Sequence, residues 1–258
     1  MFSVYSGPIL ELRDVSFRYP GNRLIIDKIG FSIGNGEFIG LLGANGSGKS
    51  TILKLAAGML YPTAGDIRLW DKPLSAYRNK DRAKLLCYFP QHLDVNAPFT
   101  VREIVGMGLY PYDIPPQMTV DEAVEMVGLG EKAGAYVTNL SGGERRRVFI
   151  AMTLIQGAGI LLLDEPLANL DIKYQIEFLR LLRGLQEKKG ISVIMALHDI
   201  NVALQFEKVM LIKEGSILGI GSPETVLTGE MIKQAFDVAV EIRKSDRGGT
   251  HITHERWF

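Results

Sequence analysis

Residues 38–50 read FIGLLGANGSGKS, and this stretch decides the fold. Its first five residues form an apolar run with no polar face, which is typical of a central strand covered on both sides in a parallel sheet. Residues 43–50 match G-x-x-x-x-G-K-[ST], and a helical pattern follows to about Leu60, before Pro62. The order strand, glycine-rich loop, helix predicts an α/β fold with a P-loop NTPase core and a mainly parallel sheet.

The glycine-rich loop has the chemistry of a polyphosphate site. Glycines let backbone N–H groups converge on an anion, and the N-terminus of the following helix adds positive potential. We expect Lys49 to reach the β- and γ-phosphates and Ser50 to bind Mg²⁺. The alternative is a glycine-rich turn with an exposed lysine, which the flanking strand and helix disfavour. The residues predicted to contact the nucleotide here are Gly43, Asn45, Gly46, Ser47, Gly48, Lys49, Ser50 and Thr51.

The segments on either side of this loop predict two smaller parts of one domain spanning 1–258. Residues 9–33 read as strands followed by a tight hairpin turn at Asn35-Gly36, which indicates an N-terminal antiparallel β subdomain. Thr100 and Thr119 each precede a glutamate by three residues, which is a capping box that begins a helix. We therefore expect an inserted α-helical subdomain at about 92–150.

The second half of the chain returns to an α/β pattern. Residues 160–164 and 191–197 read as buried strands, and apolar residues at helical spacing predict a helix over 172–189. Residues 209–221 read as a small hairpin with a turn at Glu214-Gly215, and Ser222-Pro223 is typical of a helix start.

Composition excludes several classes of protein. The 29 basic and 29 acidic residues cancel, whereas a protein that grips nucleic-acid phosphates needs a basic surplus. A single cysteine, Cys87, allows no intramolecular disulfide. The start of the sequence does not read as a secretory signal, and no apolar run is long enough to span a bilayer, so we expect any membrane role to come through a partner.

Two acidic residues end the strand at 160–164. A P-loop requires an acid on a neighbouring strand end to hold Mg²⁺, and Asp164 is placed for that role. Glu165 follows it and could orient or deprotonate an attacking water, which would make the protein a hydrolase. Without the glycine-rich loop, Asp164-Glu165-Pro166 would read as an ordinary polar strand exit.

The pentapeptide LSGGE at 140–144 predicts a second anion site. Ser141 and Glu144 form a capping box at the start of an apolar helix, and an exposed Ser-Gly-Gly helix start can bind an anion. With two such helix ends, the sequence resembles the ATPase subunit of ATP-binding cassette (ABC) transporters over essentially its whole length. In that family two cassettes pair head to tail, and each ATP lies between the P-loop of one and the signature of the other.

The resemblance implies further site residues. It assigns Tyr19 to adenine stacking, Gln91 to contact with the metal and water, and His198 to the γ-phosphate near Glu165. Taken alone, Tyr19 reads as a strand tyrosine and His198 as a structural histidine. The signature residues Ser141, Gly142 and Gly143 would contact ATP in trans, and Asp171 belongs to the loop that touches the opposite P-loop. The implied metal ligands are Ser50, Gln91 and Asp164, and the implied catalytic residues are Lys49, Gln91, Glu165 and His198.

The resemblance also implies function and partners. ATP and Mg²⁺ are the expected cofactors, and a second copy of the chain, membrane permease subunits and an external substrate-binding protein are the expected partners. The expected location is the cytoplasmic face of the membrane, peripherally bound. The segments FTVREIVGMGLYPY, LDIKYQ and GSPETVLTGEMIKQAF are similar to those of importers of iron chelates, haem or cobalamin. The alternatives are a soluble ABC ATPase in DNA repair or translation, and a nucleotide-binding switch without turnover.

Two other groups of charged or titratable residues could form sites. Arg145 to Arg147 could bind an anion, but no aromatic or further basic residues accompany them, which favours a charged helix face. His251 and His254 have a spacing that metal ligands can have, but a third ligand is missing, which disfavours a zinc site.

Overall fold

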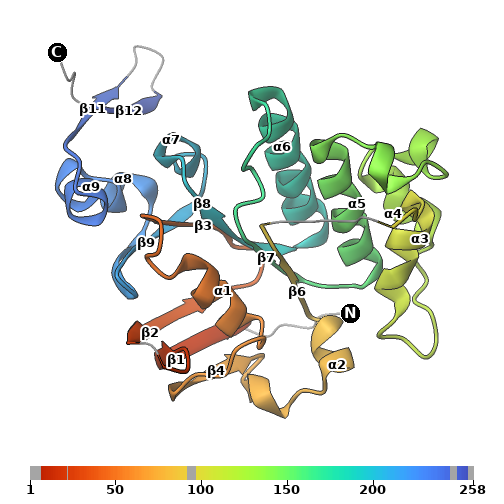
Figure 1. Cartoon of the computed structure of the whole chain (residues 1–258), viewed down its shortest axis with the longest axis horizontal. Coiled ribbons are helices and arrows are strands. Elements are labelled where there is room, and N and C mark those ends of the chain that lie inside the picture. The colour runs from red at the N-terminus through yellow and green to blue at the C-terminus, as the bar shows by residue number, and fades with distance from the viewer. Residues whose placement is uncertain (1–6, 22, 92–96, 245–248, 255–258) are drawn as a thin grey trace. The chain divides into compact units, whose positions relative to one another are not determined.

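The computed structural model describes residues 7–21, 23–91, 97–244 and 249–254, and of His254 only the backbone (Figure 1). The chain divides into two compact units, residues 1–75 with 193–258 and residues 76–192. The insert predicted at about 92–150 lies within the second unit, and its boundaries stay a prediction. Among the described residues, no helix combines the length and the apolar character needed to cross a bilayer.

The first unit contains an antiparallel sheet built from the N-terminal strands, in the order β2-β1-β4-β5. Alternating burial along β2 places one face of this sheet on the core. The strands are β1 (Leu10–Arg18), β2 (Leu24–Ile33), β4 (Ala64–Leu69) and β5 (Lys72–Pro73).

A second sheet portion in this unit has the order β10-β9-β3-β8. Strand β3 is buried at every position and pairs in parallel with β8 and β9, as its continuous apolar run predicts. The strands are β3 (Phe38–Gly43), β8 (Ser192–Leu197), β9 (Lys208–Lys213) and β10 (Ser216–Gly221).

One prediction for this region was wrong. Asn35-Gly36 does form a turn, with φ of +72° at Gly36, but the strands on its two sides do not form a hairpin. Strand β2 pairs with β1, whereas β3 pairs with β8 and β9. The turn therefore passes the chain from one sheet to the other, because β3 finds better-matched apolar partners far along the sequence.

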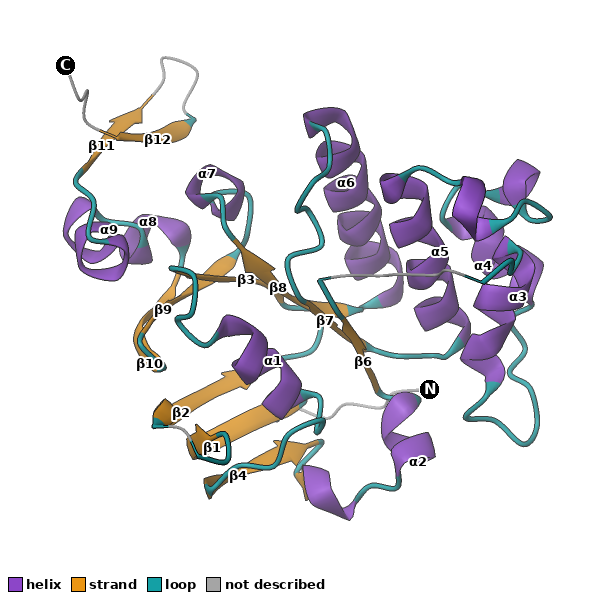
Figure 2. Cartoon of the chain, in the orientation of Figure 1, coloured by secondary structure: helices purple, strands orange, loops and turns teal. Residues whose placement is uncertain are grey.

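The remaining elements of the first unit are short helices and a C-terminal hairpin (Figure 2). The antiparallel pair β11 and β12 was not predicted from the sequence, in which these residues read as a polar tail. The elements are α1 (Lys49–Ala56), η1 (Leu74–Ala76), α7 (Ile200–Ala203), α8 (Pro223–Val226), α9 (Gly229–Phe236), β11 (Val240–Lys244) and β12 (Thr250–His254).

The second unit is mainly helical. Helices α3, α4 and α5 pack against one another, α6 contacts α5, and the strands β6 and β7 pair in parallel. Both predicted capping boxes are formed at the starts of α3 and α4. The elements are α2 (Asn79–Ala83), β6 (Leu86–Phe89), α3 (Val101–Gly106), η2 (Met107–Leu109), α4 (Val120–Met126), η3 (Gly130–Lys132), η4 (Val137–Asn139), α5 (Gly142–Ile155), β7 (Ile160–Leu163) and α6 (Ile172–Lys189).

Candidate nucleotide site

The loop between β3 and α1 follows a path that requires glycine. A Cβ at Gly43 would lie 2.4 Å from the carbonyl oxygen of Ile212 and 2.6 Å from Ser47 Oγ. Gly48 has φ of +107°, and a Cβ there would lie 2.7 Å from Ile26 Cδ1. These glycines let the backbone turn tightly before α1, which is the geometry that a cradle of N–H groups needs.

The loop concentrates positive charge and polar donors around a buried lysine. Lys49 is only 4% exposed, and its Nζ donates to the carbonyls of Gly43 (2.8 Å) and Ala44 (3.2 Å). Ser47 Oγ is buried and has no hydrogen-bond partner among the described residues. Helix α1 has no side-chain cap and no acidic residue in its first turn. A polyphosphate fits this environment, because it supplies the negative charge and acceptors that the loop lacks.

Gly215 supports this loop, and sequence reasoning missed that role. Its N–H donates to the carbonyl of Ser47 (2.9 Å), and its own carbonyl accepts from the N–H of Asp27 (3.0 Å). The predicted turn at Glu214-Gly215 is present, with φ of +47° and +79°. The turn was readable from the sequence, but its contact with a loop more than 160 positions away was not.

Two further predicted residues lie in the first unit. Strand β8 runs parallel to β3 with Leu197 opposite Leu42, so His198 leaves the sheet at the edge where the glycine-rich loop begins. The His198 side chain is exposed. Tyr19 follows β1, and its ring meets that of Phe17 edge-on, with centroids 4.8 Å apart.

In the second unit, the predicted acids Asp164 and Glu165 directly follow β7, and Gln91 follows the neighbouring strand β6. Asp164 is 3% exposed and accepts a hydrogen bond from the hydroxyl of Tyr88 (2.9 Å), a residue that the sequence analysis did not single out. Glu165 is 9% exposed, with φ of +51°, and accepts from Gln91 Nε2 (2.7 Å). The structure thus brings Gln91 and Glu165 into direct contact, as expected for two residues of one catalytic site.

The LSGGE segment begins α5 with a complete capping box. Ser141 Oγ accepts from the N–H of Glu144 (3.3 Å), whose carboxylate accepts from the N–H of Ser141 (3.0 Å). Ser141 and Gly142 are exposed, while Gly143 is buried against Tyr174. Asp171, at the start of α6, is also exposed. These exposed positions are available to a second molecule.

Each arginine of the run 145–147 has a partner within the second unit. Arg145 donates to the carbonyl of Leu140 (3.0 Å), Arg146 to that of Ala168 (2.6 Å), and Arg147 pairs with Glu177. Burial lowers the pKa of Arg146. The run therefore anchors the start of α5, which agrees with a charged helix face and not with an anion-binding run.

Only one of the two histidine side chains in the C-terminal hairpin is among the described residues. His251 lies on β12 with its side chain exposed, and the side chain of His254 lies outside the described residues, so the zinc reading of this pair stays disfavoured on its sequence alone. The described residues contain no cluster of three potential metal-binding side chains.

The two units thus hold different parts of the predicted site. The first unit holds Tyr19, Gly43, Asn45, Gly46, Ser47, Gly48, Lys49, Ser50, Thr51 and His198. The second unit holds Gln91, Ser141, Gly142, Gly143, Asp164, Glu165 and Asp171.

Comparison with known proteins identifies the family. The profile described as ABC transporter matches residues 26–168. A hemin import ATP-binding protein of Rhodopseudomonas palustris (strain HaA2) is 36% identical over 95% of this chain and 97% of its own length. An iron(3+)-hydroxamate import ATP-binding protein of Bacillus subtilis (strain 168) is 37% identical over 86% of each chain.

Solved structures agree on the fold. A putative metal-chelate type ABC transporter in an inward-facing conformation superposes with a TM-score of 0.83 at 24% identity, covering 97% of this chain and 99% of its own. The dimeric bacterial ABC transporter cassette MJ0796 superposes with a TM-score of 0.73 at 26% identity, covering 83% and 98%.

The fold and the site define a P-loop ATPase of α/β architecture. The chain belongs to the ABC transporter family, and it is an ATP-binding and ATP-hydrolysing subunit of a transporter. The predicted fold class, family and enzymatic class are confirmed. The alternative of a soluble ABC ATPase in DNA repair or translation is not favoured.

Proposed function

We propose that this chain energises a membrane importer of an iron chelate, haem or cobalamin by binding and hydrolysing Mg²⁺–ATP between two copies of itself. The observation that carries the proposal is the presence of two phosphate-type helix starts on one chain. One is the glycine loop before α1 with its buried Lys49, and the other is the exposed, Ser141-capped start of α5.

The first helix start holds the triphosphate. Lys49 offsets the charge of the β- and γ-phosphates, and the N–H groups of residues 43–51 bind their oxygens. Lys49 now bonds to the carbonyls of Gly43 and Ala44, so its ammonium is already directed along the loop. Tyr19 stacks on the adenine.

The proposed magnesium ligands have side chains suited to that ion. Ser50, Gln91 and Asp164 offer the oxygen ligands that Mg²⁺ prefers, and bound Mg²⁺ neutralises phosphate charge. Tyr88 holds Asp164 through its hydroxyl hydrogen bond, which fixes the carboxylate orientation. Glu165 orients the attacking water and receives its proton, and Gln91 holds Glu165 in place by the bond of 2.7 Å.

The second helix start contacts the ATP of the other copy. Ser141 and Gly142 are solvent-exposed, so they can meet a phosphate that this copy does not itself hold. ATP that contacts two subunits binds the closed pair more tightly than the open one, which shifts the equilibrium to closure. Hydrolysis removes that bias, and Asp171 contributes to the same interface.

The transport role adds partners outside the chain. The transported compound passes through separate permease subunits, and the chain works at the cytoplasmic face of the membrane; the relatives named as import ATP-binding proteins support this arrangement. An external substrate-binding protein delivers the compound. The relatives named for hemin, cobalamin and iron-hydroxamate import support this substrate class.

Turnover measurements on single variants test the catalytic part. Lys49→Ala and Glu165→Gln should each lower the rate of phosphate release from ATP by about 100-fold or more, because positioning and charge stabilisation supply most of the catalysis. Lys54→Ala, on the same helix, and Glu187→Gln, exposed on α6, serve as matched controls and should keep the normal rate. A near-normal rate in Lys49→Ala would refute the nucleotide assignment.

Transport assays test the substrate class. The chain would be purified with its permease subunits and reconstituted in liposomes containing ATP where the chain can reach it. Uptake of labelled ferric hydroxamate, hemin or cobalamin should depend on ATP and be abolished by Glu165→Gln. Uptake of none of the three, by a complex that still hydrolyses ATP, would contradict the assignment of substrate.

A further inference from the structure

The segment that carries His198 ends in a helix of a single turn. Helix α7 covers Ile200–Ala203 and follows directly after His198 and Asp199. Asp199 Oδ1 accepts hydrogen bonds from the N–H groups of Asn201 (2.7 Å) and Val202 (3.4 Å). A helix this short cannot hold itself in place, so tertiary contacts must determine where it lies.

Asn201 supplies a directional contact of that kind. Its Nδ2 donates to the carbonyl of Ile252 (3.0 Å), and its Oδ1 accepts from the N–H of Ile252 (2.8 Å). Ile252 is opposite Ile242 in the hairpin of β11 and β12. A side-chain amide carries the same donor and acceptor as a peptide group, so Asn201 pairs with the outer edge of β12 as a neighbouring strand would.

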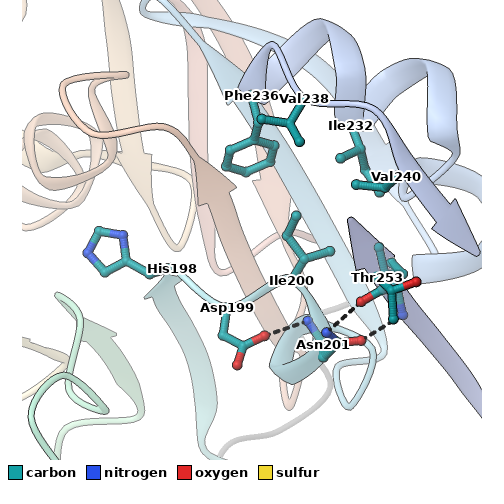
Figure 3. Close-up of a pocket in the computed structure, with 10 residues that line it drawn as sticks. His198, Asp199, Ile200, Asn201, Ile232, Phe236, Val238, Val240 and Thr253 are labelled. Carbon is teal, nitrogen blue, oxygen red and sulfur yellow. Dashed lines mark hydrogen bonds between the residues drawn. The ribbon is translucent and has the colours of Figure 1, made fainter. Parts of the chain in front are cut away.

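The contact spans a partly hollow region. A cavity of about 330 Å³ lies between the His198 segment and the C-terminal elements. Figure 3 shows His198 and Asn201 projecting in different directions from the same segment, with Asn201 directed at β12. The paired hydrogen bonds of Asn201 therefore join this segment to β12 beside the cavity, in addition to the packing of Ala203, which is buried on α7. The cavity walls are His198, Asp199, Ile200, Asn201, Ile232, Phe236, Val238, Val240, Ile252 and Thr253.

The structure therefore holds His198 from two sides. Before it, Leu197 is fixed in the sheet by pairing with β3. After it, Asn201 is fixed to the backbone of β12, three residues away. We propose that Asn201 is a positioning residue for His198, and that the C-terminal hairpin sets the turnover rate through it. This inference rests on the proposed role of His198 at the γ-phosphate.

Steady-state kinetics on the full-length chain test the inference. Asn201→Ala should lower kcat for ATP hydrolysis about tenfold while KM for ATP changes less than about twofold, because a small misplacement costs rate more than binding. Ile252→Pro removes the N–H that Asn201 accepts, so it should give the same pattern. The double variant should be no slower than Asn201→Ala alone, because Asn201→Ala already removes both hydrogen bonds to Ile252.

A control and a spectroscopic readout separate positioning from simple destabilisation. Thr253→Ala removes a hydroxyl whose hydrogen bond is a long one within the hairpin, 3.4 Å to the Glu241 carbonyl, and not one to Asn201, so kcat should be unchanged. The chain contains four histidines, so the side-chain NMR signal of His198 can be assigned with His198→Ala. That signal should shift in Asn201→Ala and stay in place in Thr253→Ala.

The outcomes distinguish this inference from the proposed function. A normal kcat in Asn201→Ala, with His198→Ala inactive, overturns the positioning role alone. A loss of thermal stability in Asn201→Ala with normal kcat and an unshifted His198 signal also overturns it, because Asn201 would then serve only the hairpin. A normal rate in His198→Ala would instead refute the role of His198 in the proposed function.

Discussion

At the scale of single residues, close packing and hydrogen bonds restrict which residue types and conformations the site can have. Gly43 has no room for a Cβ, and Lys49 is buried beside backbone carbonyls. Asp164 and Glu165 are buried as well, and each accepts a hydrogen bond from a neighbour, Tyr88 or Gln91. Burying a charged side chain costs free energy unless a partner compensates the charge. The presence of these buried ionisable residues therefore favours a functional role for them.

Tyr19 gives a prediction at this scale. Its ring is held edge-on by Phe17, which leaves a preoriented aromatic side chain beside the end of β1. Tyr19→Ala should weaken ATP binding by about 1 to 3 kcal/mol, the range for stacking of a base on an aromatic ring. Tyr19→Phe keeps the ring and should bind normally. Calorimetric titration with ATP measures both, and unchanged affinity in Tyr19→Ala would remove this residue from the site.

At the scale of elements, helix starts do much of the positioning. Helices α3, α4 and α5 all begin with a complete capping box, and the one on α5 also presents the LSGGE segment. A hydrogen bond from Lys132, together with those from Ser141, lowers the pKa of Glu144 below its ordinary value of 4.5. The ionised carboxylate thus stabilises the fold at and above neutral pH.

This pKa shift predicts a dependence of stability on pH. A lowered folded-state pKa contributes stability that is present above the ordinary value and is lost as pH falls through the folded value. Glu144→Gln cannot make this contribution, so the urea midpoint of the wild type should fall more steeply than that of the variant between pH of about 5.5 and 3. Glu131→Gln, an exposed residue nearby in sequence, is the control and should follow the wild type. Parallel curves for wild type and Glu144→Gln would contradict the role of the ionised form.

At the scale of the whole molecule, the proposed function requires two copies. Ser141, Gly142 and Asp171 are exposed in the single chain, although the LSGGE segment has the composition of an anion site. If ATP bridges two copies, these residues can bind the ATP held by the other copy. Closure of the two copies onto each other then depends on bound nucleotide.

A dimerisation experiment tests this arrangement. Glu165→Gln should form a lasting dimer with saturating ATP and magnesium, because binding persists while hydrolysis stops; light scattering gives the mass. Gly142→Arg, added to Glu165→Gln, should prevent the dimer. A Cβ at Gly142 has only ordinary contacts, 3.6 Å from Arg146 Nη1 and 3.8 Å from Leu170 Cδ2, so the monomer tolerates a side chain there. A monomer in the single variant would contradict the proposed ATP sandwich.

The sequence by itself determined the chemistry of the molecule and most of its elements. An apolar run, a glycine pattern and a capping residue act on their immediate neighbours, so β3, the glycine loop and the starts of α3, α4 and α5 could be predicted from local physics. The acids Asp164 and Glu165 were found for the same reason, since they end a buried strand.

Only the tertiary structure decided which of these elements meet. It assigned β2 and β3 to different sheets, joined Tyr88 to Asp164 and Gly215 to the glycine loop, and paired Asn201 with a hairpin that reads as a polar tail in the sequence. The physical reason is that such contacts join residues far apart along the chain. Their free energy depends on packing and on which backbone groups remain to be paired, and no local pattern contains that information.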